Sequence, residues 1–75
     1  MFWLTFETSG DIQVCIVQAN HLALARIKAG MAGQKGEFQE GHKLDAETAK
    51  KIPAKMIGRT LTHKEAFALL KRIDA

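Results

Sequence analysis

Two short runs near the start of the chain alternate apolar and polar side chains, and this pattern limits the first eighteen residues to a β-hairpin. The apolar positions of the two runs are Phe2, Leu4, Phe6, Ile12, Val14 and Ile16. The residues between the runs, Thr8-Ser9-Gly10, are of the types that form tight turns. The hairpin is therefore the strongest folding signal in the sequence.

The length of the hairpin loop decides which residues face each other. A three-residue loop, Thr8-Ser9-Gly10, places Phe6 opposite Ile12 and gathers all the apolar positions on one face. A two-residue loop places Phe6 opposite Gln13 and mixes the faces, which a sheet with one buried side penalises. Gly10 also suits the left-handed last position of a three-residue loop. We therefore predict the three-residue loop.

In this register Trp3, Cys15 and Val17 lie on the outer face of the hairpin. Exposed tryptophan beside apolar neighbours is typical of the centre of a protein interface. These three residues are therefore a candidate interface with a second copy or another protein. The alternative is that the C-terminal helix covers this face, which would make the three residues part of the core.

A helix is predicted directly after the hairpin, from His21 to Met31 or Ala32, with Asn20 as N-cap and Gly33 ending the helix. It has two apolar stripes on nearly opposite sides. The first stripe contains Ala23, Leu24, Ile27 and Met31, and the second contains Leu22, Ala25 and Ala29. A helix with one apolar stripe needs one partner layer, whereas this helix could use two.

Residues 37–43 are a weaker strand candidate, because Phe38 is their only large apolar residue and Gly41 interrupts them. A polar strand that contains glycine suits the edge of a sheet. Together with the hairpin and the helix, this strand would complete a ββαβ unit. The pattern does not indicate which hairpin strand it pairs with.

Three helical segments are expected in the C-terminal third. Asp45 caps a short helix over residues 46–52, which Pro53 interrupts. Residues 53–57 are expected to form a helical turn, although an extended segment over residues 56–61 is the alternative.

The last helix, over residues 63–73, has the clearest start signal. Thr62 and Glu65 form a capping box directly before an apolar run. We therefore expect this helix to pack its apolar side on the rest of the chain.

These elements predict an α+β fold, in which an N-terminal antiparallel hairpin leads a sheet of two or three strands and the C-terminal third is helical. The 75 residues correspond to one domain over residues 1–75. A domain this small is only marginally stable alone, so self-association is a common remedy.

Charge is distributed unevenly along the chain. Residues 1–40 carry three basic and four acidic side chains, a net charge of −1, whereas residues 41–75 carry eight basic and four acidic ones, a net charge of +4. Five basic residues are candidate contacts to nucleic acid, namely Lys50, Lys51, Lys55, Arg59 and Lys64. The short helix, turn and second helix superficially suggest a helix-turn-helix, but Pro53 breaks the first helix and Glu65 lies near the start of the second.

No motif in the chain indicates catalysis, a cofactor or a metal. His21, His42 and His63 are evenly spaced, but their flanking residues differ, and no close pair of ligands such as His-x-x-x-His occurs. Cys15 lies in mid-strand, away from a helix N-terminus that would activate its thiol. We therefore expect neither catalytic nor metal-binding nor cofactor-binding residues.

The sequence thus favours a non-catalytic binding or regulatory module that associates with itself or with another protein. Nucleic-acid binding through the basic second half is the alternative. A single cysteine and no recognisable signal peptide favour the cytoplasm. No apolar run approaches the roughly 20 residues of a membrane span, so no membrane partner is expected.

Overall fold

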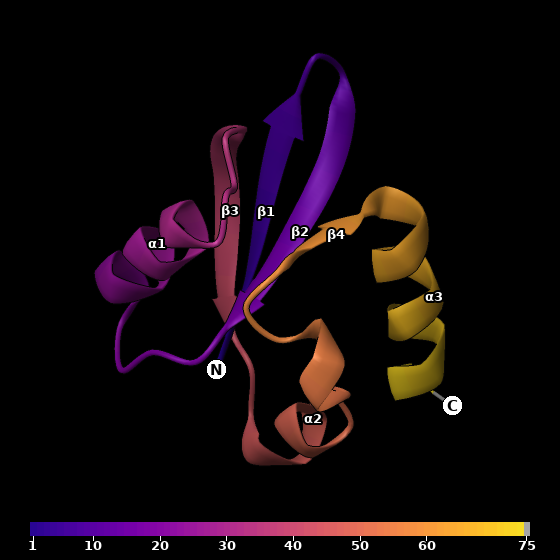
Figure 1. The fold of residues 1–75 in the computed structure, drawn as a ribbon. Helices are drawn as coiled ribbons and strands as arrows, with labels where there is room; N and C mark the ends of the chain where they lie inside the picture. Colours follow the sequence, from indigo (N-terminus) through magenta and orange to yellow (C-terminus); the bar gives the residue numbers. More distant parts are fainter. Residues whose placement is uncertain (75) are drawn as a thin grey trace.

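The computed structural model describes residues 1–74, which form a small α+β fold with four strands (Figure 1). The elements in chain order are β1 (Phe2–Thr8), β2 (Asp11–Val17), α1 (Leu22–Met31), β3 (Glu37–Lys43), α2 (Ala46–Lys50), the 3-10 helix η1 (Ala54–Met56), β4 (Thr60–Thr62) and α3 (His63–Asp74). The predicted fold class is confirmed, including the leading hairpin and the C-terminal helix.

The strands form one antiparallel sheet in the order β3-β1-β2-β4. The weak strand predicted over residues 37–43 is therefore real, pairs with β1 and lies at an edge. A β-bulge interrupts its pairing between Thr5 and Phe6 of β1. The sheet has one strand more than predicted, because residues 60–62 pair with β2.

Helices cover both faces of this sheet (Figure 1). On one face, the α1 face, sheet residues and α1 share a buried cluster of Phe2, Leu4, Phe6, Cys15, Val17, Ala25 and Ala29. On the other, the α3 face, the buried cluster consists of Trp3, Val14, Ile16, Ile52, Leu61, Ala66 and Leu69. The chain thus has two thin cores in place of one.

The hairpin loop has two residues, so the predicted register is wrong. Phe6 pairs with Gln13, and Thr8 pairs with Asp11. Ser9 and Gly10 both have positive φ, 50° and 86°, as a tight two-residue hairpin turn requires. The three-residue loop was predicted because it gathers the apolar residues on one buried face. Both faces are covered here, so each can accept apolar side chains and the two-residue loop carries no penalty.

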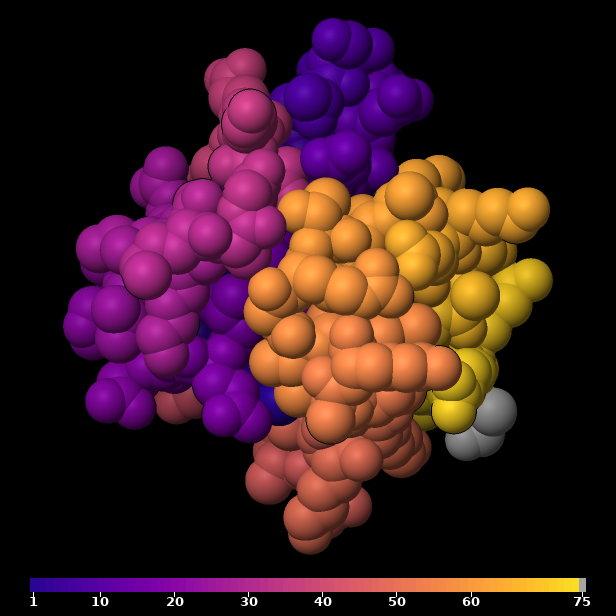
Figure 2. Space-filling view, in the orientation of Figure 1, coloured from indigo at the N-terminus to yellow at the C-terminus, as the bar shows by residue number. Residues whose placement is uncertain are grey.

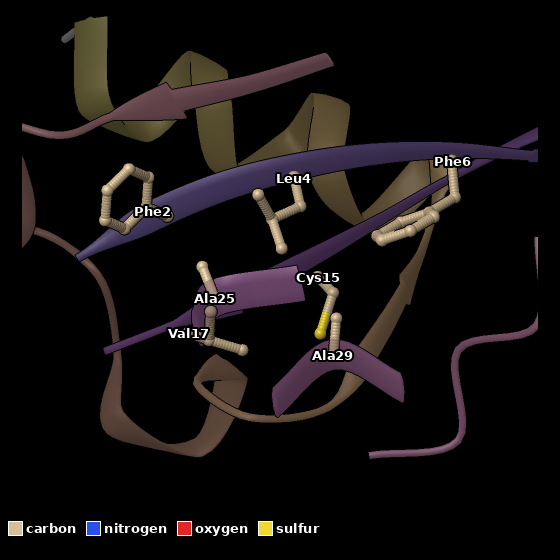
Figure 3. Packing of buried hydrophobic residues seen from close by; sticks show 7 residues of the cluster. All are labelled: Phe2, Leu4, Phe6, Cys15, Val17, Ala25 and Ala29. Atoms are coloured by element: carbon tan, nitrogen blue, oxygen red, sulfur yellow. The ribbon is translucent and has the colours of Figure 1, made fainter. Parts of the chain in front are cut away.

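The corrected register separates the three residues predicted to form an outer interface. Trp3 lies on the α3 face with 9% of its surface exposed, whereas Cys15 and Val17 lie on the α1 face with 0% and 3% exposed. Figure 3 shows Cys15 and Val17 beside Ala25 and Ala29 of α1. The predicted patch does not exist on this fold, because the helices bury all three residues.

Two helix boundaries differ slightly from prediction. The N-cap of α1 is His21 and not Asn20, because the Nδ1 atom of His21 accepts a hydrogen bond from the Leu24 N–H at 3.2 Å. Gly33 follows the helix with a φ of 97°, as expected of a glycine that ends a helix. α2 ends at Lys50, two residues before its predicted end.

The segment around Pro53 contains both conformations that the sequence left open. Residues 54–56 form the 3-10 turn η1, and residues 60–62 are extended as β4. The predicted capping box is present, since Glu65 N–H donates to Thr62 Oγ1 and Thr62 N–H donates to Glu65 Oε1, both at 3.1 Å. None of the helices in residues 1–74 has the length and apolar character needed to cross a membrane.

Candidate protein-binding surface

Helix α1 packs on the sheet mainly through its small residues and leaves two of its large ones, Ile27 and Met31, mostly in solvent. Ala25 and Ala29 are fully buried, whereas Ile27 is 60% exposed and Met31 is 82% exposed. The α1 outer face is defined here by Ala23, Ile27, Gly30 and Met31, which lie at helical spacing and are all exposed. The sequence predicted the two stripes, and the structure shows that only one has a partner within the described chain.

The bulk of the sheet residues explains this orientation. Phe2, Leu4 and Phe6 project from β1 into the same layer as α1 (Figure 3). Because protein interiors are closely packed, small facing residues let a helix lie close to a sheet face that carries such large side chains. Alanine therefore faces the sheet, and the remaining apolar stripe must face away from it.

A groove of about 480 Å³ runs between α1 and the start of β3. Ala23, Ile27 and Gly30 line its helical wall, and Phe6 and Phe38 line its sheet side. The two phenylalanine rings meet edge to face with their centroids 5.7 Å apart. The groove therefore extends the α1 outer face towards the exposed edge of the sheet.

Positive charge borders this apolar surface. The guanidinium carbon of Arg26 lies 4.3 Å from the centre of the Phe38 ring, a cation–π contact. Lys28 donates to the backbone oxygen of Gln18 at 2.6 Å. Since Leu22–Met31 contains no acidic residue, α1 presents apolar and cationic groups together.

A second and smaller exposed apolar site lies on α3. Phe67 is 53% exposed and Leu70 is 43% exposed. The Phe67 ring already has local neighbours, because the Lys71 Nζ atom lies 4.9 Å from its centre and the His63 ring lies 6.3 Å away. This site is therefore less open than the α1 outer face.

The residues predicted to contact nucleic acid are spread over α2, η1, the loop before β4 and the start of α3. Three of them have partners within the chain. Lys50 lies 4.0 Å from Glu47, Lys51 donates to the Ile73 backbone oxygen at 3.1 Å, and Arg59 donates to Glu65 Oε2 at 3.0 Å. Strand β4 separates η1 from α3, so the segment is not a helix-turn-helix.

The side chains considered for chemistry are dispersed. Among residues 1–74, no three histidine, cysteine or acidic side chains lie close enough together to hold a metal ion. His21 caps α1, His42 lies 3.5 Å from Glu40 on β3, and His63 begins α3. Cys15 is fully buried, and this burial raises the pKa of its thiol.

Comparisons of the chain with protein-family models, with curated proteins and with solved structures found no match. The α1 outer face and its groove are therefore the features of the molecule on which a function can be argued. The two opposite stripes of α1 were the sequence signal for this surface.

Proposed function

We propose that the protein is a non-catalytic protein-binding module of the cytoplasm, and that the α1 outer face is its contact surface. The observation that supports this role is the orientation of α1, which buries Ala25 and Ala29 and exposes Ile27 and Met31. The dispersed histidines and the buried thiol of Cys15 support the non-catalytic part of the proposal.

The exposed apolar side chains of α1 add little to the stability of the isolated chain. Burial of an isoleucine or methionine side chain stabilises a fold by about 1.5–3 kcal/mol, and Ile27 and Met31 contribute little of this to the isolated chain. Single exposed apolar residues are common on protein surfaces. Here they are contiguous with a groove that contains two phenylalanine rings, and contiguous apolar patches are typical of interaction sites.

Site-specific photo-crosslinking tests the proposal. We expect a chain with benzoylphenylalanine in place of Ile27, expressed in the native host, to form one discrete protein adduct whose mass identifies the partner. The same group in place of Glu47, whose side chain is 85% exposed on α2, is the matched control and should form no such adduct. The absence of a protein adduct at position 27 would contradict the proposed function.

A pair of serine substitutions separates binding from folding. Ile27→Ser together with Met31→Ser should leave the thermal midpoint within a few degrees of the original value, because both side chains are already in solvent. In a chain that carries the photoreactive group at Ala23 of the same face, this double substitution should remove the adduct. If the adduct persists at full yield, the apolar groups are not the contact surface.

Nucleic-acid binding is a second candidate, supported by one observation. Residues 41–75 carry a net charge of +4. Within this stretch, residues 50–74 lie largely on one side of the molecule, the orange and yellow side in Figure 2. Titration with duplex and single-stranded oligonucleotides at two salt concentrations tests this role. Electrostatic binding must weaken as salt rises, and a lack of binding at low salt would exclude the role.

A further inference from the structure

We propose that the protein bound by this module is a second copy of the chain, joined by antiparallel pairing of the two β3 edges about a two-fold axis at Gly41. The inference rests on the proposed function and names its partner. Three features support it: the backbone groups of β3 that point away from β1, the polar side chains along β3, and the position of Leu22.

The free side of β3 has backbone groups available for pairing. β3 is the edge strand next to β1, and the Leu44 N–H donates to the Met1 oxygen at 2.9 Å. Backbone groups alternate in direction along an antiparallel strand, so Leu44 and His42 point towards β1. The N–H and C=O groups of Gly41 and Lys43 therefore point outward, where another strand can reach them.

Symmetry restricts the registers that two copies of β3 can adopt. Adjacent pairs in an antiparallel ladder alternate between hydrogen-bonded and non-hydrogen-bonded types. A two-fold axis must relate pairs of the same type, so one residue must lie opposite its own copy. The regular part of β3 covers residues 40–43. An axis at Lys43 would place two ammonium groups opposite each other, so the remaining central residues are Glu40, Gly41 and His42.

Side-chain hydrogen bonding favours Gly41 as the central residue, because an imidazole N–H can donate to a carboxylate without carrying a charge. With Gly41 on the axis, Glu40 lies opposite His42 of the second copy, and this pair occurs twice. Their side chains are 65% and 62% exposed and share the α3 face, on which Glu40 pairs with Thr5 and His42 with Trp3. At the axis, the outward N–H of each Gly41 can donate to the C=O of the other Gly41.

The neighbouring registers lack this complementarity. An axis at Glu40 places the two Glu40 carboxylates directly opposite each other, and like charges in that position are destabilising. An axis at His42 pairs the two imidazoles and places Gly41 opposite Lys43. Charged edge strands and bulges usually prevent strand addition, but the mixed charges of β3 instead select one register.

Leu22 connects this edge to helix α1. A methyl group at Gly41 would lie 2.7 Å from Leu22 Cδ1, so Leu22 lies directly over Gly41 on the α1 face, where it is 38% exposed. A two-fold axis perpendicular to the sheet keeps both α1 helices on the same face. The two copies of Leu22 would therefore cover the pair of Gly41 residues, and the α1 outer faces would lie beside the joint.

A charge exchange between two variants tests this geometry. Glu40→Lys and His42→Glu each replace an attractive pair with a less favourable one, so each variant alone should dimerise about tenfold more weakly than the original chain in sedimentation equilibrium. In an equal mixture, the lysine of the Glu40→Lys chain lies opposite the glutamate of the His42→Glu chain. The unchanged Glu40 of the second chain then lies opposite the unchanged His42 of the first. We expect the mixture to form heterodimers in preference to either homodimer.

The matched control is the exposed pair Glu47 and Lys50, which lies on α2, outside the paired edge of β3. Glu47→Lys and Lys50→Glu change the net charge in the same directions and should not alter association by more than about twofold. If the β3 variants associate as the control variants do, the β3 joint is wrong. Circular dichroism should show that all four exposed substitutions leave the fold intact.

Disulfide trapping provides a second test that does not depend on affinity. Positions 40 and 42 of the two copies form a non-hydrogen-bonded pair, where opposed Cα atoms approach to about 4.5 Å. A mixture of Glu40→Cys and His42→Cys chains should therefore form a mixed disulfide dimer faster than either variant alone. Equal rates for the mixture and the separate variants would overturn the register.

The two proposals fail in different ways. A strictly monomeric chain at high micromolar concentration, combined with a position-27 adduct of unrelated mass, overturns the homodimer and leaves the binding function standing. An adduct of twice the chain mass together with equal trapping rates keeps self-association but overturns the β3 joint. The absence of a protein adduct at position 27 would overturn the proposed contact surface itself.

Discussion

The side chain of Gln34 donates a hydrogen bond of 2.9 Å to the Oε1 atom of Gln13, and so links the loop after α1 to the middle of β2. Gln34 also accepts a hydrogen bond from the Thr60 hydroxyl at 3.0 Å. Only 9% of its surface is exposed, so Gln34 is a buried polar residue. Its two contacts join three segments that are distant in the sequence.

We predict that Gln34→Ala destabilises the fold by about 1–3 kcal/mol, because the Thr60 hydroxyl loses its acceptor and Gln13 Oε1 keeps only the 3.5 Å contact with Thr8 Oγ1. Urea unfolding followed by circular dichroism measures the change. Gln39→Ala is the control, since Gln39 is exposed on β3 and should change the free energy of unfolding by less than about 0.5 kcal/mol. Equal effects of the two substitutions would contradict the structural role of Gln34.

A second prediction concerns the contact between Gly41 and Leu22. Gly41→Ala should destabilise the monomer by about 1–3 kcal/mol, because its methyl group would lie 2.7 Å from Leu22 Cδ1 and 2.9 Å from Leu4 Cδ2. The cost should be smaller in a Leu22→Ala background, where one of the crowding groups is absent. A double-mutant cycle at a concentration where the chain is monomeric measures this coupling.

Gly30 provides the opposite expectation within the same molecule. A methyl group there meets no atom within 4 Å, and the residue lies inside α1. Gly30→Ala should therefore stabilise the chain by about 0.5–1 kcal/mol through helix propensity. A loss of stability at both glycines would indicate that α1 does not lie over β3 in the way described.

Two elements were predicted from short-range sequence patterns, one strong and one weak. The capping box at Thr62 and Glu65 identified the start of α3, and the polar run over residues 37–43 identified an edge strand. In both cases the decisive information lies within a few residues of the element. The fold class follows from these elements and from the hairpin.

The hairpin register could not be predicted in the same way, because it depends on how many faces of the sheet are covered. Ser9-Gly10 is a weaker signal for a two-residue turn than Asn-Gly. Ser9 also adopts a positive φ, a conformation that is unfavourable for most residues other than glycine. Once α1 and α3 cover opposite faces, Trp3 and Cys15 can both be buried. The position of a remote helix thus decides a local pairing.

The candidate surface was predicted only in part from the sequence, for a related reason. The pattern showed two stripes on α1 but did not show which one the sheet would accept. The small residues Ala25 and Ala29 pack against Leu4 and Phe6, and this choice depends on packing across elements and not on local spacing.

A third prediction concerns the pH dependence of stability. The hydrogen bond from the Thr62 backbone, followed by the bond from the Arg59 side chain, holds the pKa of Glu65 below its ordinary value. A carboxyl group with a lowered pKa in the folded state stabilises the fold at pH values above the ordinary pKa of glutamate. That contribution is lost as the pH falls from there through the folded pKa.

Glu65→Gln should therefore reduce the loss of stability between about pH 5 and pH 3, compared with the original chain. Thr62→Ala should lower stability at neutral pH by about 1 kcal/mol, because it removes the cap of α3. Thermal unfolding across this pH range measures both effects. An unchanged acid slope in Glu65→Gln would assign the acid sensitivity to other carboxyl groups, of which Asp45 is the next candidate because the backbone of Thr48 lowers its pKa.

The fourth prediction uses Cys15 to report on the opening of α1. In Figure 3 the Cys15 sulfur points towards Ala29, and both residues are fully buried. Burial also raises the pKa of the thiol, so the reactive thiolate is scarce even when reagent reaches it. A thiol reagent at neutral pH should therefore modify the native chain roughly a hundredfold more slowly than the chain unfolded in guanidinium chloride.

An exposed cysteine provides the control for this rate. Gln39→Cys in a Cys15→Ala chain should react promptly, because position 39 lies on the exposed edge strand. If native Cys15 reacts as fast as this control, α1 must leave the sheet readily, since no reagent can reach the thiol while Ala29 lies against it. The α1 outer face would then be a transient surface, and Ala25 and Ala29 would be exposed together with Ile27 whenever the helix opens.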